Sequence, residues 1–131
     1  MPSISQSGPN PRRLTILIAE DHFDSREALS TLLEAFGYDV VTAVNGREAV
    51  QLAREAPPDL ILMDIMMPEM DGFEATRRVR ESEATREIPI IVVTAMEGAR
   101  NLALQAGATD FLRKPIDSRT LLDRIRALTT A

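Results

Sequence analysis

Five short apolar runs, each followed by a stretch with helical periodicity, most strongly constrain the fold of this 131-residue chain. Polar and turn-forming residues bound each run, as is typical of strands buried in a parallel sheet. The predicted strands cover residues 14–19, 38–43, 59–63, 89–94 and 109–113, and the predicted helices cover 24–36, 46–56, 72–83, 97–106 and a last segment from 117 or 118. Because parallel strands are joined by right-handed helical crossovers, the pattern predicts an α/β protein with one doubly wound, five-stranded parallel sheet.

The helices differ in which faces they are expected to bury. Apolar residues recur at helical spacing along the first helix, which predicts that they pack on the sheet. They are Leu29, Leu32, Leu33 and Phe36. On the helix 72–83 we expect the arginines at positions 77, 78 and 80 to form a solvated face.

Composition limits the class of protein. The length suits one domain, which we place at residues 14–131, and the polar segment 1–13 is expected to be a disordered tail. The formal net charge of −5 argues against a general affinity for nucleic acid, and the absence of cysteine excludes disulfides and thiol catalysis. Because no apolar run is long enough to span a bilayer, we expect a cytoplasmic protein without membrane contact.

Polar residues follow four of the five predicted strands. They are Glu20 and Asp21 after the first, Asp64 after the third, Thr94 at the end of the fourth, where the small Ala95 follows it, and Lys114 after the fifth. Each has a simple explanation by itself, as a turn residue, a helix-start acid or a surface charge. Because the carboxyl ends of parallel strands share one edge of the sheet, however, we expect these side chains to meet there.

The expected cluster predicts a chemistry. Three carboxylates at close range repel one another and require a cation, and oxygen ligands favour Mg²⁺, with Mn²⁺ as an alternative. A carboxylate beside such an ion is a plausible nucleophile for phosphoryl transfer, which would make Asp64 an aspartyl phosphate. The ion, the Lys114 ammonium and the Thr94 hydroxyl could then each meet one phosphoryl oxygen. His22, the single histidine, is interpreted as a loop or helix-start residue.

Taken together, these motifs resemble the receiver (response regulator, CheY-like) domain of two-component signalling over residues 14–128. The motifs are Ala19-Glu20-Asp21, the run from Leu62 through Asp64 to Gly72, Val93-Thr94-Ala95, Gly107 to Leu112, and Lys114-Pro115. The resemblance implies a flavodoxin-like (βα)5 fold with strand order 2-1-3-4-5. It also implies a phosphoprotein that accepts a phosphoryl group from a histidine kinase or a histidine phosphotransfer protein and then controls a downstream protein.

The resemblance assigns a role to each site residue. Asp64 would be the phospho-acceptor, and Asp21, Asp64 and the Met66 carbonyl would bind Mg²⁺, with Glu20 acting through water. Thr94, the Ala95 backbone N–H and Lys114 would contact the phosphoryl group. Thr94 and Phe111 would form the conformational switch, with Phe111 at a position where tyrosine is commoner, and the Lys114–Pro115 bond would be cis. The resemblance is compatible with a monomer or a weak, phosphorylation-dependent dimer.

One departure from the family pattern affects the helix predicted at 97–106. The spacing between Thr94 and Lys114 is about two residues shorter than usual for receivers, and Gly98 and Asn101 are poor helix formers. We therefore expect this helix to be short or displaced.

Alternative functions remain at this point. The chain stops after the last predicted helix, which suggests a switch without an attached output domain, or else the excised receiver of a larger DNA-binding regulator or hybrid kinase. A Mg²⁺-dependent phosphatase with an aspartate nucleophile commonly carries a second carboxylate two residues later, where this chain has Met66. A degenerate receiver used only for binding is disfavoured by the complete set of site residues. We therefore expect a protein that catalyses only its own phosphorylation and dephosphorylation, rather than an enzyme acting on a separate substrate.

Overall fold

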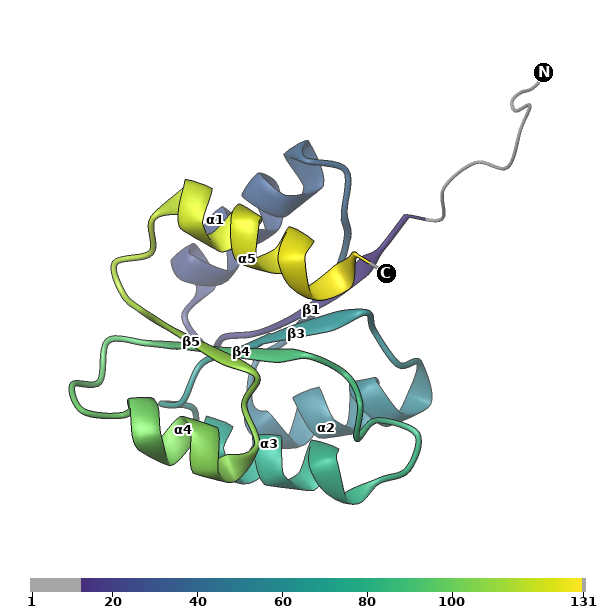
Figure 1. Cartoon of the computed structure of the whole chain (residues 1–131), viewed down its shortest axis with the longest axis vertical. Helices are drawn as coiled ribbons and strands as arrows, with labels where there is room; N and C mark the ends of the chain where they lie inside the picture. The colour runs from purple at the N-terminus through teal and green to yellow at the C-terminus, as the bar shows by residue number, and fades with distance from the viewer. Residues whose placement is uncertain (1–12, 131) are drawn as a thin grey trace.

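The computed structural model describes residues 13–130, which form one parallel sheet between two layers of helices (Figure 1). The elements are β1 (Thr15–Ala19), α1 (Phe23–Ala35), β2 (Asp39–Ala43), α2 (Gly46–Glu55), β3 (Leu60–Met63), α3 (Gly72–Glu81), β4 (Ile90–Thr94), α4 (Arg100–Ala106), β5 (Asp110–Arg113) and α5 (Ser118–Thr129). The five strands run in the order β2-β1-β3-β4-β5. The predicted fold class and strand order are therefore confirmed.

The sheet brings the carboxyl ends of its strands to one level. Ala19 at the end of β1 pairs with Met63 at the end of β3, and Thr94 at the end of β4 pairs with Arg113 at the end of β5. All of these pairings are parallel, so the residues that follow the strands emerge along the same edge. Residues 1–12, on which most of the predicted tail falls, lie outside the described part of the chain.

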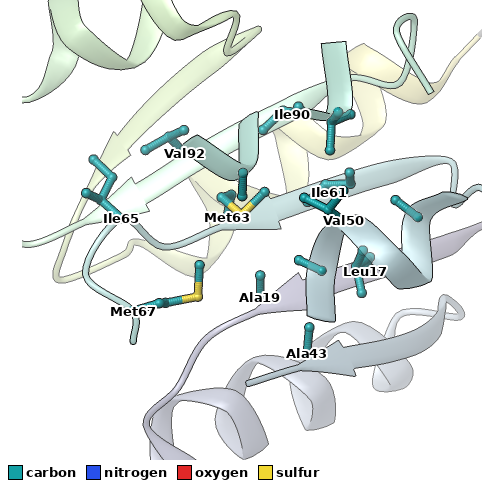
Figure 2. Packing of buried hydrophobic residues seen from close by; sticks show 14 of the residues in the cluster. Leu17, Ala19, Ala43, Val50, Ile61, Met63, Ile65, Met67, Ile90 and Val92 are labelled. Carbon is teal, nitrogen blue, oxygen red and sulfur yellow. The ribbon is translucent and has the colours of Figure 1, made fainter. Parts of the chain in front are cut away.

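Two apolar layers hold the sheet between its helices. Successive side chains along a strand point to opposite faces of the sheet. Leu17, Ile61 and Val92 share one face and pack toward α2, α3 and α4 (Figure 2). Ile18 and Ile91 belong to the second layer, which packs against α1 and α5. Burying a side chain of this size stabilises the fold by roughly 1.5–3 kcal/mol, so the core fixes the position of the carboxyl edge.

The start of α3 is built against the loop that follows β3. Asp71 caps this helix by accepting a hydrogen bond from the Glu74 N–H at 2.9 Å. Gly72 lies so close to the loop that an added Cβ would stand 2.0 Å from the Asp64 carbonyl oxygen. The requirement for glycine at position 72 thus comes from close backbone contact beside Asp64.

Helix α4 is short, as predicted. It has 7 residues and begins three residues later than the sequence suggested, because Gly98 adopts a φ of 75° and Ala99 at the N-cap has no side-chain oxygen to cap the helix. Gly107 ends the helix at a φ of 114°.

Two predictions about side-chain burial are wrong, because Arg80 was expected to be solvated and Phe36 was expected to pack on the sheet. Arg80 is half-buried, and its guanidinium donates hydrogen bonds to Ile88 O at 2.6 Å, Gly107 O at 2.8 Å and Arg86 O at 3.0 Å. The burial of Arg80 follows from these backbone acceptors, which lie on segments that the helix periodicity does not include.

Phe36 is 58% exposed because α1 ends at Ala35 and the chain turns away at the following residue. Within residues 13–130, the helices are all too short or too polar to cross a bilayer.

Candidate functional site

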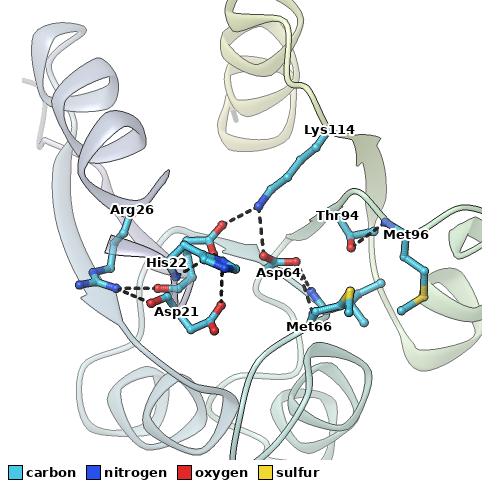
Figure 3. A network of polar contacts seen from close by, with 10 residues as sticks. Asp21, His22, Arg26, Asp64, Met66, Thr94, Met96 and Lys114 are labelled. Atoms are coloured by element: carbon cyan, nitrogen blue, oxygen red, sulfur yellow. Dashed lines mark hydrogen bonds and ion pairs between the residues drawn. The ribbon is translucent and has the colours of Figure 1, made fainter. Parts of the chain in front are cut away.

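The structure brings the predicted residues Glu20, Asp64 and Lys114 into direct contact at the carboxyl edge of the sheet. The Lys114 Nζ lies 2.6 Å from Glu20 Oε1 and 3.1 Å from Asp64 Oδ2 (Figure 3). The three residues follow β1, β3 and β5, and Lys114 reaches past the end of β4, because β5 is a neighbour of neither β1 nor β3 in the sheet. The expected meeting of these residues is therefore observed.

Both carboxylates of this contact are buried. Glu20 is 1% exposed and Asp64 is 7% exposed, whereas a solvated acid would retain most of its surface. Asp64 Oδ1 accepts hydrogen bonds from the Ile65 N–H at 2.7 Å and, more weakly, from the Met66 N–H at 3.4 Å. These bonds orient the carboxylate, with its other oxygen directed toward Lys114.

Burial and charge move the pKa values of the two acids in opposite directions. Burial and the nearby charge of Glu20 raise the pKa of Asp64 above its ordinary value, and the hydrogen bond from Lys114 only partly offsets them. For Glu20, burial also favours the neutral form, but hydrogen bonds from Lys114 and the His22 N–H lower its pKa overall. The same two carboxylates raise the pKa of Lys114 despite its burial, so the ammonium stays charged.

Asp21 provides a separate indication of a cation site. Its Oδ1 atom is buried and has no hydrogen-bond partner among residues 13–130. An unpartnered carboxylate oxygen is costly to bury, and a metal ion is one partner that would satisfy it. Asp21 offers a ligand atom within 4.8 Å of ligand atoms from Glu20 and His22, and the two carboxylates of this group suit a hard divalent cation.

The backbone around the acidic pair is held by Arg26, a residue that the sequence analysis did not identify. Its guanidinium donates to the Glu20 carbonyl at 3.0 Å and to the Asp21 carbonyl at 3.3 Å. The sequence feature that could have identified Arg26 is its position near the start of the helix that follows Glu20 and Asp21. His22 is the N-cap residue of α1, as predicted, and its ring Nδ1 also lies 3.3 Å from Glu20 Oε2 and 3.4 Å from Asp21 Oδ1.

The remaining predicted residues differ in their burial and contacts. Thr94 is fully buried, its Oγ1 accepts the Met96 N–H at 3.2 Å, and its carbonyl accepts the Lys114 N–H at 2.9 Å. Met66 is 61% exposed and Ala95 is exposed beside the site. Phe111 is half-buried and packs against the apolar layer that faces α2, α3 and α4. The Lys114–Pro115 bond is cis, as expected from the resemblance.

Comparisons with known proteins identify the family to which the chain is similar. Residues 16–126 match the family model described as the response regulator receiver domain. The protein PilH of Pseudomonas aeruginosa is 42% identical over 115 residues, which cover 86% of this chain and 95% of PilH. The response regulator PleD of Caulobacter vibrioides is also 42% identical, over 116 residues that cover 87% of this chain but only 26% of PleD. The chain thus spans about a quarter of PleD.

A solved structure extends the likeness to the fold. The receiver domain of the sensor histidine kinase PA1611 from Pseudomonas aeruginosa, crystallised with a magnesium ion coordinated in its active-site cleft, is 34% identical. It superposes with a TM-score of 0.86 and covers 92% of this chain and 100% of that domain. The chain described here belongs to the response regulator receiver family.

Proposed function

We propose that this receiver is a phosphorylation-controlled switch in which Asp64 is the phospho-acceptor. The observation that carries the proposal is the contact between Asp64 Oδ2 and Lys114 Nζ at 3.1 Å, next to the buried Glu20. A buried carboxylate with a fixed cation on one oxygen has the arrangement needed to receive a phosphoryl group and to neutralise the charge that it brings.

The transfer moves one phosphoryl group from a phosphohistidine donor to Asp64. One Asp64 carboxylate oxygen attacks phosphorus, the bond between phosphorus and the donor nitrogen breaks, and the leaving imidazole takes up a proton. Lys114 pairs with one phosphoryl oxygen, and Thr94 Oγ1 and the Ala95 N–H donate to others after Thr94 releases Met96. When bound, Mg²⁺ supplies further positive charge to the phosphoryl oxygens.

We propose that Asp21, Asp64 and the Met66 carbonyl hold this ion directly and that Glu20 holds it through water. The support is the buried Oδ1 of Asp21, which has no hydrogen-bond partner among residues 13–130, and the closeness of the Asp21 and Glu20 carboxylates. The magnesium in the PA1611 receiver supports the choice of ion by similarity. Mn²⁺ stays a prediction.

The proposed switch is a change in the partners of Lys114 and Thr94. Here Lys114 is shared between Glu20 and Asp64, and Thr94 is occupied by the Met96 N–H. A phosphoryl group on Asp64 would compete with both carboxylates for Lys114, and it would accept a hydrogen bond from the Thr94 hydroxyl, which would draw Thr94 toward the site and away from the Met96 N–H. Movement of Thr94 changes the space available to Phe111 beside α4, which would alter the surface seen by a partner.

The proposed partners are a histidine kinase or a histidine phosphotransfer protein upstream and a protein target downstream. PilH is matched along nearly all of its length, whereas PleD is matched along about a quarter. Similar receivers therefore exist both as small proteins and as parts of larger ones. Accordingly, the receiver of a longer regulator or hybrid kinase is the second candidate.

The proposal is tested by intact mass after incubation with acetyl phosphate and Mg²⁺. We expect a gain of one phosphoryl group that is absent without metal and absent in Asp64→Asn. Asp71→Asn is the matched control, because Asp71 lies on the same loop but only caps α3, and asparagine caps equally well. The assignment would be overturned if Asp64→Asn gained a phosphoryl group as the wild type does. It would also be overturned if Asp71→Asn lost the gain while Asp64→Asn kept it.

A further inference from the structure

His22 lies over the acidic pair rather than away from it. It occupies the N-cap position of α1, and its backbone N–H donates to Glu20 Oε2 at 3.1 Å. This hydrogen bond holds the backbone of His22, and with it the attachment point of the imidazole side chain, beside the Glu20 carboxylate. Figure 3 shows the imidazole next to Asp21, on the side of the site opposite to Lys114.

Two carboxylate oxygens and one imidazole nitrogen converge at this position. Glu20, Asp21 and His22 each offer a ligand atom within 4.8 Å of the others. His22 Nδ1 lies 3.3 Å from Glu20 Oε2 and 3.4 Å from Asp21 Oδ1. Two ligands bound at about 2.1 Å to one ion, at tetrahedral or octahedral angles, lie roughly 3.0–3.4 Å apart. The observed separations therefore match donors that share an ion.

The oxygens on this side of the site are the ones that Lys114 leaves free. Lys114 binds Glu20 Oε1 and Asp64 Oδ2, whereas Glu20 Oε2 faces His22. Asp21 Oδ1 is buried and has no hydrogen-bond partner within the described residues. The structure thus separates the edge into a lysine side and a histidine side.

We propose that His22 is a direct ligand for a divalent transition-metal ion, together with Asp21 and Glu20, and that Zn²⁺ represents this class. The inference rests on the metal site of the proposed function, adds a nitrogen ligand to it, and has Glu20 Oε2 bind the transition-metal ion directly, whereas Glu20 is proposed to hold Mg²⁺ through water. Imidazole binds zinc and nickel well, whereas Mg²⁺ takes oxygen ligands. The receiver should consequently bind such ions more tightly than Mg²⁺ and lose Mg²⁺ in their presence, since both use the same carboxylates.

The competing explanation is that the His22 ring only donates a hydrogen bond to Glu20. The composition makes the two explanations separable. The sequence contains one histidine and no cysteine, so any imidazole–metal signal must come from His22 and no thiolate can take the ion.

The test uses the untagged chain and two titrants, Zn²⁺ and Mg²⁺, followed by calorimetry and by NMR of the histidine ring nitrogens. We expect saturation with Zn²⁺ to move the Nδ1 resonance strongly and saturation with Mg²⁺ to leave it near its metal-free position. In His22→Gln, the ratio of Zn²⁺ to Mg²⁺ affinity should fall by about tenfold or more, the scale of losing a metal-site residue. Asp24→Asn is the matched control, because it removes a nearby exposed charge without removing a ligand and should leave the ratio unchanged.

The outcomes distinguish the two proposals. An unchanged ratio in His22→Gln, or an Nδ1 resonance that Zn²⁺ does not move, would overturn the role of His22 while leaving the Mg²⁺ site intact. Failure of the wild type to bind either ion would instead overturn the metal site of the proposed function, and the role of His22 with it.

Discussion

The Lys114 ammonium lies 3.1 Å from Asp64 Oδ2, although the two residues are 50 positions apart in the chain and follow strands separated by β4. The backbone supports this reach, because the Lys114 N–H donates to the Thr94 carbonyl at the end of β4. The cation that would receive the phosphoryl charge is therefore in place before phosphorylation, paired with the acceptor and with Glu20.

Removing this cation should destabilise the metal-free protein. In Lys114→Met, Glu20 and Asp64 lose the charge between them, and we expect the free energy of unfolding to fall by about 1–3 kcal/mol, the cost of buried groups left without a partner. Urea unfolding measures this change. Lys114→Arg, which keeps the charge, should lose less, and saturating Mg²⁺ should recover part of the loss in Lys114→Met. Equal stabilities of Lys114→Met and wild type would contradict the account.

Asp64 itself should reduce stability in the absence of metal. Its folded-state pKa is raised by burial and by Glu20, so ionising it disfavours the fold at a pH above that value. We expect Asp64→Asn to raise the free energy of unfolding near pH 7 by roughly 0.5–2 kcal/mol, as for other substitutions that trade function for stability. As the pH falls through the raised pKa, Asp64 becomes protonated in the folded wild type and the difference should shrink. Urea titrations at several pH values test this, and a difference that grows toward low pH would count against it.

Arg80 should matter for the position of the α4–β5 connection. Arg80→Ala removes donors to Gly107 O and Ile88 O, and we expect a loss of about 1–3 kcal/mol with faster hydrogen exchange at residues 107–110. Arg77→Ala is the control, since Arg77 is exposed and pairs only with Glu74 among the contacts described, and it should change stability by less than about 0.5 kcal/mol. Similar effects of the two substitutions would show that the buried hydrogen bonds of Arg80 contribute little.

Helix α4 should be among the least protected helices. It has 7 residues, begins at Arg100 and has at its N-cap Ala99, which has no side-chain oxygen to cap it, whereas α3 has 10 residues and an Asp71 cap. We expect amides in α4 to exchange faster than those in α3 when followed by mass spectrometry. Strong protection across residues 97–106 would be the opposite result and would require a different account of the shortened segment.

Features that depend on residues adjacent in sequence could be predicted, whereas features that depend on contacts between distant segments could not. The strands and the carboxylates after them are adjacent in sequence, so Glu20, Asp21 and Asp64 could be placed on one edge from the βα pattern alone. The burial of Arg80 could not, because its acceptors lie on the loop before β4 and at the end of α4. The contacts of His22 and Arg26 with the acidic pair depend on the directions of their side chains at the start of α1, which the periodicity of the helix does not specify. Phe36 fits the apolar face of α1 by spacing but lies one residue beyond its end.

The most direct test of the central claim is to locate the phosphoryl group. Borohydride reduces an aspartyl phosphate to homoserine, so the protein would be phosphorylated with acetyl phosphate and Mg²⁺, reduced, digested and sequenced by mass spectrometry. The account predicts homoserine at position 64 and retention of aspartate at positions 21 and 71. Homoserine at another position, or a phosphoryl group that resists reduction because it is carried by His22, would contradict the assignment of Asp64 as the acceptor.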